Sequence, residues 1–194
     1  DAKYVLQKLT TEEKNKALQT AANDLCERQE EILAANVLDL ENGKNNGMNP
    51  GLLDRLKLTG ERIAQIAEGL RQIAALPDCI GETIEHFERP NGLKIDKVRV
   101  PLGVIGIIYE ARPNVTADAF GLCFKTGNAV ILKGGSDAIH SNIAIVKVLQ
   151  DALEACSMPR TAVQLIEDTD RAVTAQFMKM KEYVDVLIPR GGAG

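Results

Sequence analysis

Three short segments of the sequence carry the residue types that bind anionic ligands. They are Glu110 to Asn114 (EARPN), Lys133 to Ser136 (KGGS) and Pro189 to Gly194 (PRGGAG), and each follows a short apolar run. Glycine allows the backbone to approach a ligand closely, while arginine and lysine side chains bind phosphate and carboxylate groups. The three segments are therefore candidates for a site that binds phosphorylated or carboxylate-bearing molecules.

The first segment offers two candidate side chains, Arg112 and Asn114. The Arg112 guanidinium could bind a carboxylate or a phosphate through two parallel hydrogen bonds. The Asn114 amide could donate a hydrogen bond to an oxyanion that develops during a reaction. The alternative is a surface ion pair between Arg112 and Glu110, with Asn114 as a turn residue. Taken alone, the segment favours this alternative.

The second and third segments are candidate phosphate-binding loops. In the second, two glycines precede a predicted helix whose N-terminus attracts anions, and a lysine adds positive charge. It is not a Walker A loop, because the pattern G-x-x-x-x-G-K-[ST] is absent. The alternatives are a tight turn with a surface lysine and Ser136 or Asp137 as helix cap, and, for the third segment, a flexible turn. The candidate cofactor-binding residues are Lys133, Gly134, Gly135, Ser136, Arg190, Gly191 and Gly192.

The cysteines do not form a recognisable metal or catalytic site. Cys26, Cys79, Cys123 and Cys156 contain no CxxC spacing, and the chain has only two histidines, so we expect no metal. Three of the cysteines fall in predicted helices, where packing is their usual role. Cys79 lies in a loop, but no histidine is near it in sequence to activate it. Reduced thiols in a cytoplasm are the expected state.

A parallel sheet would bring the three segments together. Four apolar runs, at 104–109, 129–132, 162–166 and 184–188, alternate with segments of helical period at 116–126, 137–155 and 170–180. This alternation predicts an α/β fold with a parallel, Rossmann-type sheet covered on both faces. The carboxyl ends of such strands share one edge, where ligands bind.

The residues before this sheet have a different pattern. Residues 1 to about 76 predict helices, with Thr10-x-x-Glu13 as a capping box, Thr59 as a second cap and a loop from Asn42 to Pro50. Two alternating runs around Pro90-Asn91-Gly92 predict a β-hairpin. The resulting division is a helical region at 1–82, a hairpin segment at 83–103 and an α/β domain at 104–194.

Composition excludes several classes of protein. The 194 residues are 45% hydrophobic and 26% charged, which argues against disorder, and the net charge of -4 does not support nucleic-acid binding. No apolar run approaches the roughly 20 residues of a membrane helix. The N-terminus lacks the pattern of a signal peptide, so we expect a cytoplasmic protein without membrane contact.

Several of these segments together resemble one enzyme family. Residues 98–106 (VRVPLGVIG), 109–116 (YEARPNVT), 127–136 (GNAVILKGGS) and 188–194 (IPRGGAG) are similar to the gamma-glutamyl phosphate reductase family of the aldehyde dehydrogenase superfamily. The helical part agrees, including Ala34-Ala35-Asn36 with Asp39 and Leu53-Asp54-Arg55-Leu56. The resemblance implies an aldehyde-dehydrogenase-like fold and an oxidoreductase of proline biosynthesis. That reaction reduces gamma-glutamyl phosphate to glutamate 5-semialdehyde with NADPH.

The resemblance also implies roles for individual residues. Lys133 would approach the adenosine ribose, and Ser136 stands where NAD-using members of the superfamily often have a glutamate, which favours NADP. Arg190-Gly191-Gly192 would meet the phosphates of the cofactor. Glu110 and Arg112 would bind the charged ends of the substrate. Asn114 roughly matches the oxyanion asparagine of the superfamily.

The family's nucleophilic cysteine matches none of the four cysteines here, since it lies beyond the last matched segment. We therefore expect this chain to be the cofactor-binding part, with an incomplete α/β domain and no catalytic cysteine domain, and to be inactive alone. Homo-oligomers through the hairpin segment and a functional contact with glutamate 5-kinase are further expectations. The alternative is a nucleotide-binding or interaction module with no chemistry of its own.

Overall fold

The computed structural model describes residues 1–110 and 112–190, and its first part is helical as predicted. One difference is that the third helix continues to Asn45, so the prediction of a loop is wrong for residues 42–45. Gly43 is buried there beside Leu53 and Met48, and this packing extends the helix. The helices are α1 (Ala2–Leu6), α2 (Thr11–Glu27), α3 (Gln29–Asn45), α4 (Pro50–Leu56) and α5 (Gly60–Ala75).

The starts of α2 and α5 follow from their capping residues. Thr10 and Glu13 form both bonds of a capping box, with Thr10 N donating to Glu13 Oε2 at 2.7 Å. Thr59 Oγ1 accepts a hydrogen bond from Arg62 N at 3.1 Å. The two helices lie along each other and bury their apolar faces together, since side chains such as Leu18 and Leu70 are fully buried.

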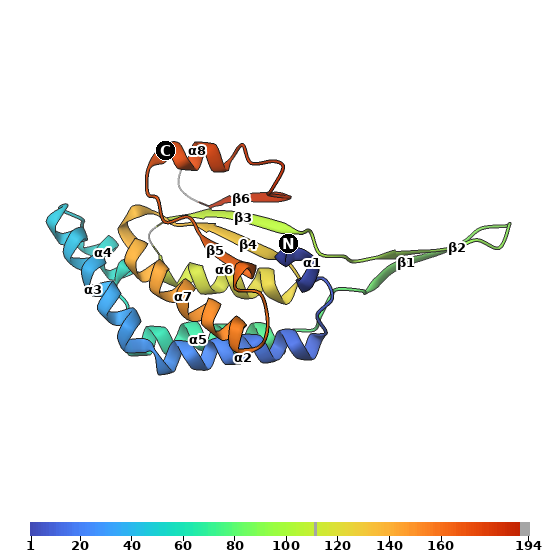
Figure 1. Cartoon of the computed structure of the whole chain (residues 1–194), viewed down its shortest axis with the longest axis horizontal. Helices are drawn as coiled ribbons and strands as arrows, with labels where there is room; N and C mark the ends of the chain where they lie inside the picture. The colour runs from blue at the N-terminus through green and yellow to red at the C-terminus, as the bar shows by residue number, and fades with distance from the viewer. Residues whose placement is uncertain (111, 191–194) are drawn as a thin grey trace.

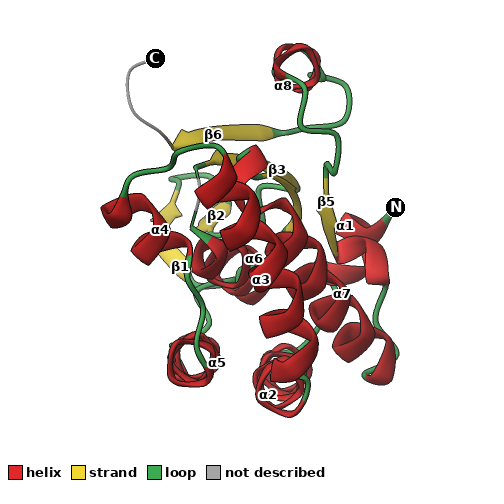
Figure 2. Cartoon of the chain, turned by 90° about the vertical axis from the view of Figure 1, so that its left-hand side faces the viewer, coloured by secondary structure: helices red, strands yellow, loops and turns green. Residues whose placement is uncertain are grey.

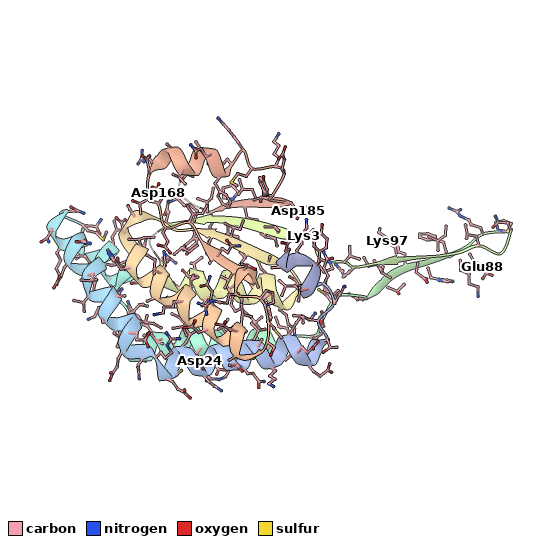
Figure 3. All side chains as sticks on the ribbon, in the orientation of Figure 1. Lys3, Asp24, Glu88, Lys97, Asp168 and Asp185 are labelled. Atoms are coloured by element: carbon pink, nitrogen blue, oxygen red, sulfur yellow. The ribbon has the colours of Figure 1, made fainter. Side chains whose placement is uncertain are left out.

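The hairpin consists of β1 (Thr83–Glu88) and β2 (Lys94–Val98), which pair antiparallel. Gly92 has φ +83° in the turn, a conformation that favours glycine. Every residue of both strands is exposed. Figures 1 and 3 show the hairpin as an arm that leaves the body of the molecule, with Glu88 and Lys97 on it.

The remaining strands form one parallel sheet in the order β5-β4-β3-β6. The last crossover helix is shorter than the predicted 170–180, because it begins after Asp170 and ends at Phe177. The strands are β3 (Val104–Tyr109), β4 (Ala129–Lys133), β5 (Val163–Leu165) and β6 (Val186–Arg190). The helical segments between them are α6 (Pro113–Lys125), η1 (Ser136–Ala138), α7 (Ile139–Ala155), η2 (Arg160–Ala162) and α8 (Arg171–Phe177).

The elements are arranged in layers. In Figures 1 and 2, α6 and α7 cover one face of the sheet, α8 lies over the other, and α2 and α5 form a further layer beneath α6 and α7. The centre of the core lies on α6, where Phe120 and Phe124 are fully buried with ring centroids 5.3 Å apart. Gly121 allows α5 to approach, since a Cβ there would lie 2.7 Å from Leu70. The layers are those of a doubly wound α/β domain.

Polar contacts fasten the outer elements to this core. Lys14 of α2 forms a buried ion pair with Asp78, just after α5. Asp185, before β6, accepts a hydrogen bond from Val104 N at 2.7 Å and pairs with Lys3 at 3.1 Å. Figure 3 shows Lys3 and Asp185 at the same end of the sheet. These contacts hold the first helix and the amino ends of β3 and β6 together.

None of the helices in the described residues has the length and apolar character needed to cross a membrane.

Candidate functional site

The order of the strands creates a crevice between β3 and β6. The chain proceeds from β3 outward to β4 and β5, then returns through α8 to place β6 on the other edge of β3. In parallel sheets, ligands bind beyond the carboxyl ends of the strands where the order reverses in this way. Tyr109 is level with Arg190, and Ile108 is level with Lys133, so the three strand ends share one edge.

A cleft of about 270 Å³ opens at this point. The side chains come from the ends of β3 and β6, the start of α6 and the end of α4. This switch-point cleft brings together residues of the first and third anion-binding segments. Its lining residues are Arg55, Tyr109, Glu110, Arg112, Val115 and Arg190.

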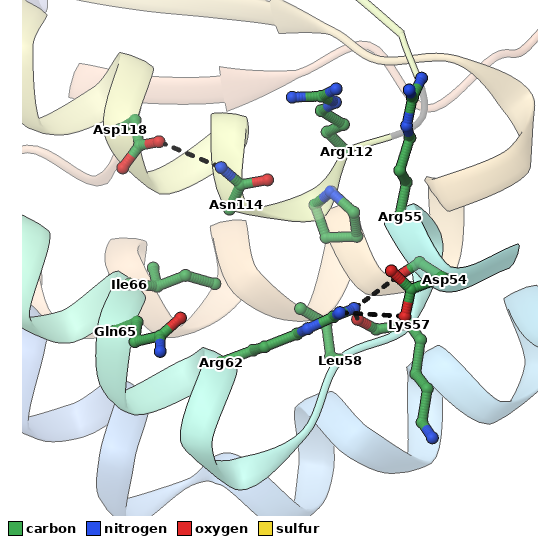
Figure 4. A pocket seen from close by; sticks show the side chains of 11 residues that line it. Asp54, Arg55, Lys57, Leu58, Arg62, Gln65, Ile66, Arg112, Asn114 and Asp118 are labelled. Carbon is green, nitrogen blue, oxygen red and sulfur yellow. Dashed lines mark hydrogen bonds and ion pairs between the residues drawn. The ribbon is translucent and has the colours of Figure 1, made fainter. Parts of the chain in front are cut away.

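A second, larger cleft of about 400 Å³ lies beside the first. Figure 4 shows it between the α4–α5 connection and the first turns of α6. We call it the α5–α6 cleft. Arg55 and Arg112 line both clefts, so the two are neighbours with a shared cationic wall. The other charged or amide side chains of the α5–α6 cleft are Asp54, Lys57, Arg62, Gln65, Asn114 and Asp118.

The charges in these clefts are unevenly satisfied. Arg62 is held by Asp54 at 3.0 Å and by the Lys57 carbonyl at 2.7 Å. By contrast, neither Asp54 nor Asp118 forms an ion pair with Arg55, Arg112 or Arg190. Three guanidinium groups around a cleft favour an anionic ligand.

Asp118 is the second carboxylate of the α5–α6 cleft. Its half-buried side chain accepts a hydrogen bond from Asn114 Nδ2 at 3.3 Å. Burial raises the pKa of Asp118, while the Asn114 hydrogen bond and the charge of Arg190 act in the opposite direction. The Asn114 amide nitrogen is thus engaged with Asp118, and its carbonyl oxygen points into the cleft (Figure 4).

The position of Arg55 is fixed by a residue from α3. Asn36 is buried, donates from Nδ2 to the Leu56 carbonyl at 2.9 Å and accepts from Leu58 N at 2.8 Å. These two bonds hold residues 56–58 against α3, with the Leu56 and Leu58 side chains buried in the core. Arg55, the residue before Leu56, is exposed at the cleft.

Arg112 is placed by the turn from β3 into α6. It is the N-cap residue of α6, with extended φ and ψ of -139° and 98°, and Pro113 follows in the first helical turn. Proline disfavours a helical conformation in the residue before it, so it keeps Arg112 out of the helix. The guanidinium therefore lies at the boundary of the two clefts.

The second predicted segment, Lys133 to Ser136, begins with a lysine that is more buried than the sequence indicates. Lys133 is buried, and its Nζ donates to the Gly134 carbonyl at 3.2 Å. The alternative of a surface lysine is thus wrong. So is the alternative that Ser136 or Asp137 caps the long helix, because Asp39 of α3 accepts the hydrogen bonds from its first turn.

A buried polar network lies directly beneath this segment. Tyr109 and Thr116 are hydrogen-bonded at 2.7 Å, and Thr116 donates to Asn142 Oδ1 at 2.9 Å. Burial raises the pKa of Tyr109 to about 12. A Cβ on Gly134 would collide with Asn142 Nδ2, so only glycine fits there. In the described part of the chain, this Nδ2 is the one buried side-chain nitrogen or oxygen without a hydrogen-bond partner.

The structure thus groups the predicted residues unequally. Glu110, Arg112 and Arg190 meet in the switch-point cleft, and Asn114 lies in the neighbouring one. Lys133, Gly134, Gly135 and Ser136 lie at the end of β4 on the same sheet edge. Gly191 and Gly192 are outside the described residues.

Five charged lining residues were not predicted as site residues: Asp54, Arg55, Lys57, Arg62 and Asp118. Arg55 falls in a segment that resembles the family, which was a usable signal. Asp118 falls inside a mainly apolar helix, and nothing in its local pattern separates it from a surface carboxylate.

No metal site is found among the described residues, and no cysteine lies at the clefts. No group of three or more histidine, cysteine or acidic side chains could hold a metal ion there. All four cysteines are unpaired, and none lines either cleft. Burial raises the pKa of Cys123 to about 12, which makes it a poor nucleophile at neutral pH.

Comparison with known proteins gives a consistent result. The model of the aldehyde dehydrogenase family matches residues 1–191. The chain is 60% identical over 194 residues to the gamma-glutamyl phosphate reductase of Heliobacterium modesticaldum, of which it covers 46%. The crystal structure of gamma-glutamyl phosphate reductase from Thermotoga maritima superimposes with a TM-score of 0.97 at 44% identity, over 100% of this chain and 47% of that one.

A yeast protein of the same name, from Saccharomyces cerevisiae, superimposes with a TM-score of 0.89 at 30% identity, over 98% of this chain and 49% of that one. The chain therefore spans about half the length of the relatives that it matches. These matches confirm the predicted aldehyde-dehydrogenase-like α/β fold and the predicted resemblance.

Proposed function

The chain belongs to the aldehyde dehydrogenase family, and from this membership we propose that it serves the reduction of gamma-glutamyl phosphate to glutamate 5-semialdehyde, a step of proline biosynthesis. In this reaction the acyl carbon loses phosphate and gains a hydride from NADPH, which leaves as NADP. These 194 residues contribute the part that binds the cofactor. The similarity to reductases of this name, at 60% identity for one of them, supports the proposal.

One observation carries the proposal on the structural side. Three guanidinium groups, those of Arg55, Arg112 and Arg190, line a cleft at the strand reversal. Both reactants of the proposed reaction carry phosphate, which arginine binds with good geometry. Glu110 and Arg112 are proposed to bind the charged ends of the substrate, and Asn114 to stabilise the oxyanion with the second N–H of its Nδ2, since Asp118 accepts only the first.

The end of β4 has features that suit a dinucleotide. The turn after β4 lies on the sheet edge where ligands bind, and Gly134 and Gly135 add no side chains to it. Bound NADPH would supply the hydride. Lys133, Gly134, Gly135 and Ser136 would hold its adenosine side, and Arg190, with Gly191 and Gly192, its phosphates. Ser136 in place of a carboxylate removes repulsion against a 2'-phosphate, so NADP is preferred over NAD.

We propose that the 194 residues do not catalyse this reaction alone. The thiolate that the family uses must meet the acyl carbon, yet no cysteine of this chain lines either cleft. The same observation is what favours the second candidate, a nucleotide-binding module without chemistry of its own.

The exposed hairpin is the proposed contact between copies of the chain. Apolar side chains on this arm are 40–54% exposed, which is typical of a surface that a partner covers: Ile84, Phe87, Leu93, Ile95 and Val98. A functional contact with glutamate 5-kinase and a cytoplasmic location are also proposed, because acyl phosphates hydrolyse readily and are best used where they are made.

The experiment joins these residues to the remaining part of the Heliobacterium relative and follows NADPH oxidation with gamma-glutamyl phosphate. We expect turnover by the chimera and none by the 194-residue chain. The chain itself should bind NADPH more tightly than NADH, and Lys133→Ala should weaken NADPH binding by about tenfold, as expected for one charge-assisted contact. An inactive chimera with intact NADPH binding supports the module, while equal affinity for both cofactors refutes the NADP preference.

A further inference from the structure

The α5–α6 cleft carries opposite charges at its two ends. Figure 4 shows Asp118 at one end and Arg55 at the other, with Asn114 and Arg112 between them. The arginine end is the wall shared with the switch-point cleft, whereas Asp118 lines only the α5–α6 cleft. A ligand that matches this cleft has a cationic group at one end and an anionic group at the other.

Asp118 is available to such a ligand. In the described residues it has no cationic partner within ion-pair distance, and its printed hydrogen bond, from Asn114, is long at 3.3 Å. Gly69 of α5 faces Asp118 without a side chain, and a Cβ added there would be in van der Waals contact with Asp118 Oδ1, at 3.6 Å. By contrast, Asp54 is already paired with Arg62 at 3.0 Å. The cleft therefore contains one carboxylate that a ligand cation can still satisfy.

A half-buried carboxylate without an ion-pair partner is costly: burial raises the pKa of Asp118, and the Asn114 hydrogen bond and the charge of Arg190 offset this only in part. An ammonium group bound beside it would relieve this cost. A ligand of equal shape without the ammonium group should bind more weakly, because the Asp118 carboxylate then stays desolvated without an ion-pair partner.

We propose that Asp118 determines substrate specificity by binding the α-ammonium group of an amino acid whose far end is held by Arg55 and Arg112. This assignment rests on the proposed function and names how its substrate is selected. The acyl phosphate end lies at the shared arginine wall and faces the switch-point cleft, where the hydride donor is proposed to bind. Other acyl or aldehyde substrates, which lack an α-ammonium group, leave Asp118 unsatisfied.

The test compares two stable phosphonates that differ only in the amino group. The probes are 2-amino-6-phosphonohexanoate and 6-phosphonohexanoate, and their affinities for the 194-residue chain are measured by calorimetry. We expect the amino compound to bind about tenfold more tightly or better, the size of a charge-assisted hydrogen bond. Asp118→Asn should abolish this preference and leave the affinity for 6-phosphonohexanoate unchanged.

Two further variants separate recognition from folding. Glu68→Gln removes one negative charge from the exposed side of α5, outside both clefts, and should keep the preference. Arg55→Gln should weaken both probes by a similar factor, since it contacts the group that they share. Equal binding of the two probes by the unaltered chain, absence of binding, or an unchanged preference in Asp118→Asn overturns the proposal.

The outcomes also distinguish this inference from the proposed function. A chimera that reduces gamma-glutamyl phosphate while the chain shows no amino preference overturns the role of Asp118 alone. A chimera that is inactive while Asp118 still controls the preference overturns the reductase function and leaves an amino-acid phosphate binding site.

Discussion

Replacing Asp39 with asparagine tests how the first helices hold the sheet domain. The Asp39 carboxylate is 1% exposed and accepts hydrogen bonds from the first turn of α7. The distances are 3.1 Å from His140 N, 2.8 Å from His140 Nδ1, 2.8 Å from Ser141 N and 2.5 Å from Ser141 Oγ. Two of these donors are backbone N–H groups of a helix start, which need an acceptor when they are buried.

The size of the effect follows from the number of donors that lose an acceptor. Asparagine keeps one oxygen and places an NH₂ group where the other was. The two donors that bonded to the replaced oxygen then face this NH₂ group, which cannot accept their hydrogen bonds. A lost hydrogen bond to a charged group costs about 1.5–3 kcal/mol, and we expect a total of about 2–4 kcal/mol because the two losses overlap. That is a large part of the roughly 5–15 kcal/mol that stabilises a typical domain.

Urea unfolding followed by circular dichroism gives the free energy of unfolding. The matched control is Asp170→Asn, because Asp170 also caps a helix, α8, but is exposed and accepts one N–H bond, from Ala172 at 2.8 Å. Asparagine and aspartate are equivalent as ordinary N-caps, so the control should lose less than about 0.5 kcal/mol. Equal losses in both variants would show that Asp39 is only another helix cap.

Three further predictions concern the core. Burial raises the pKa of Asp78, but hydrogen bonds, chiefly from Lys14, lower it more, so the pKa in the folded protein is depressed. The stability that Asp78 adds is therefore present above about pH 4 and is lost as the pH falls below it. Urea titrations at several pH values should show this loss, and Asp78→Asn, which leaves Lys14 buried without a charged partner, should cost about 3–5 kcal/mol at neutral pH and flatten the acid dependence. Cys123 should label with a thiol reagent only on unfolding, so Cys123→Ser should leave the number of fast-reacting thiols unchanged; loss of a fast-reacting thiol would contradict its burial. Gly106→Ala should destabilise by about 1–3 kcal/mol in the same urea assay, since its Cβ would lie 2.8 Å from Phe177 Cζ, and an unchanged midpoint would show that α8 is not packed on β3 as described.

Much of the fold was accessible from the sequence because its signals are local. The capping box at Thr10, the cap at Thr59 and the apolar runs of the strands each depend on residues a few positions apart. The parallel arrangement followed from the alternation of these runs with helical segments. The end of α3 was missed because packing of Gly43 against α4, a contact that the local sequence does not reveal, extends the helix.

The clefts were accessible only in part, since they depend on which strands are neighbours. Counting apolar runs places the ends of β3, β4 and β6 on one edge, but it does not give the order β5-β4-β3-β6. That order makes β3 and β6 neighbours, and it is the reason that Arg112 and Arg190 share a cleft while the end of β4 lies on the far side of β3. Residue types therefore predict which segments can bind anions, and the topology decides which of them act together.

The helical region contributes more to the clefts than its sequence indicates. Asn36 joins the end of α4 to Ser141 of α7, with its Nδ2 3.0 Å from Ser141 Oγ, and Asp39 accepts from the same serine. Arg55 is thus fixed relative to the sheet domain through one buried chain of hydrogen bonds. Asn36 and Asp39 lie three positions apart on α3, a spacing that puts them on one helix face but does not reveal what that face meets. Because buried polar groups must be paired, a change at either residue should displace Arg55 without touching the cleft.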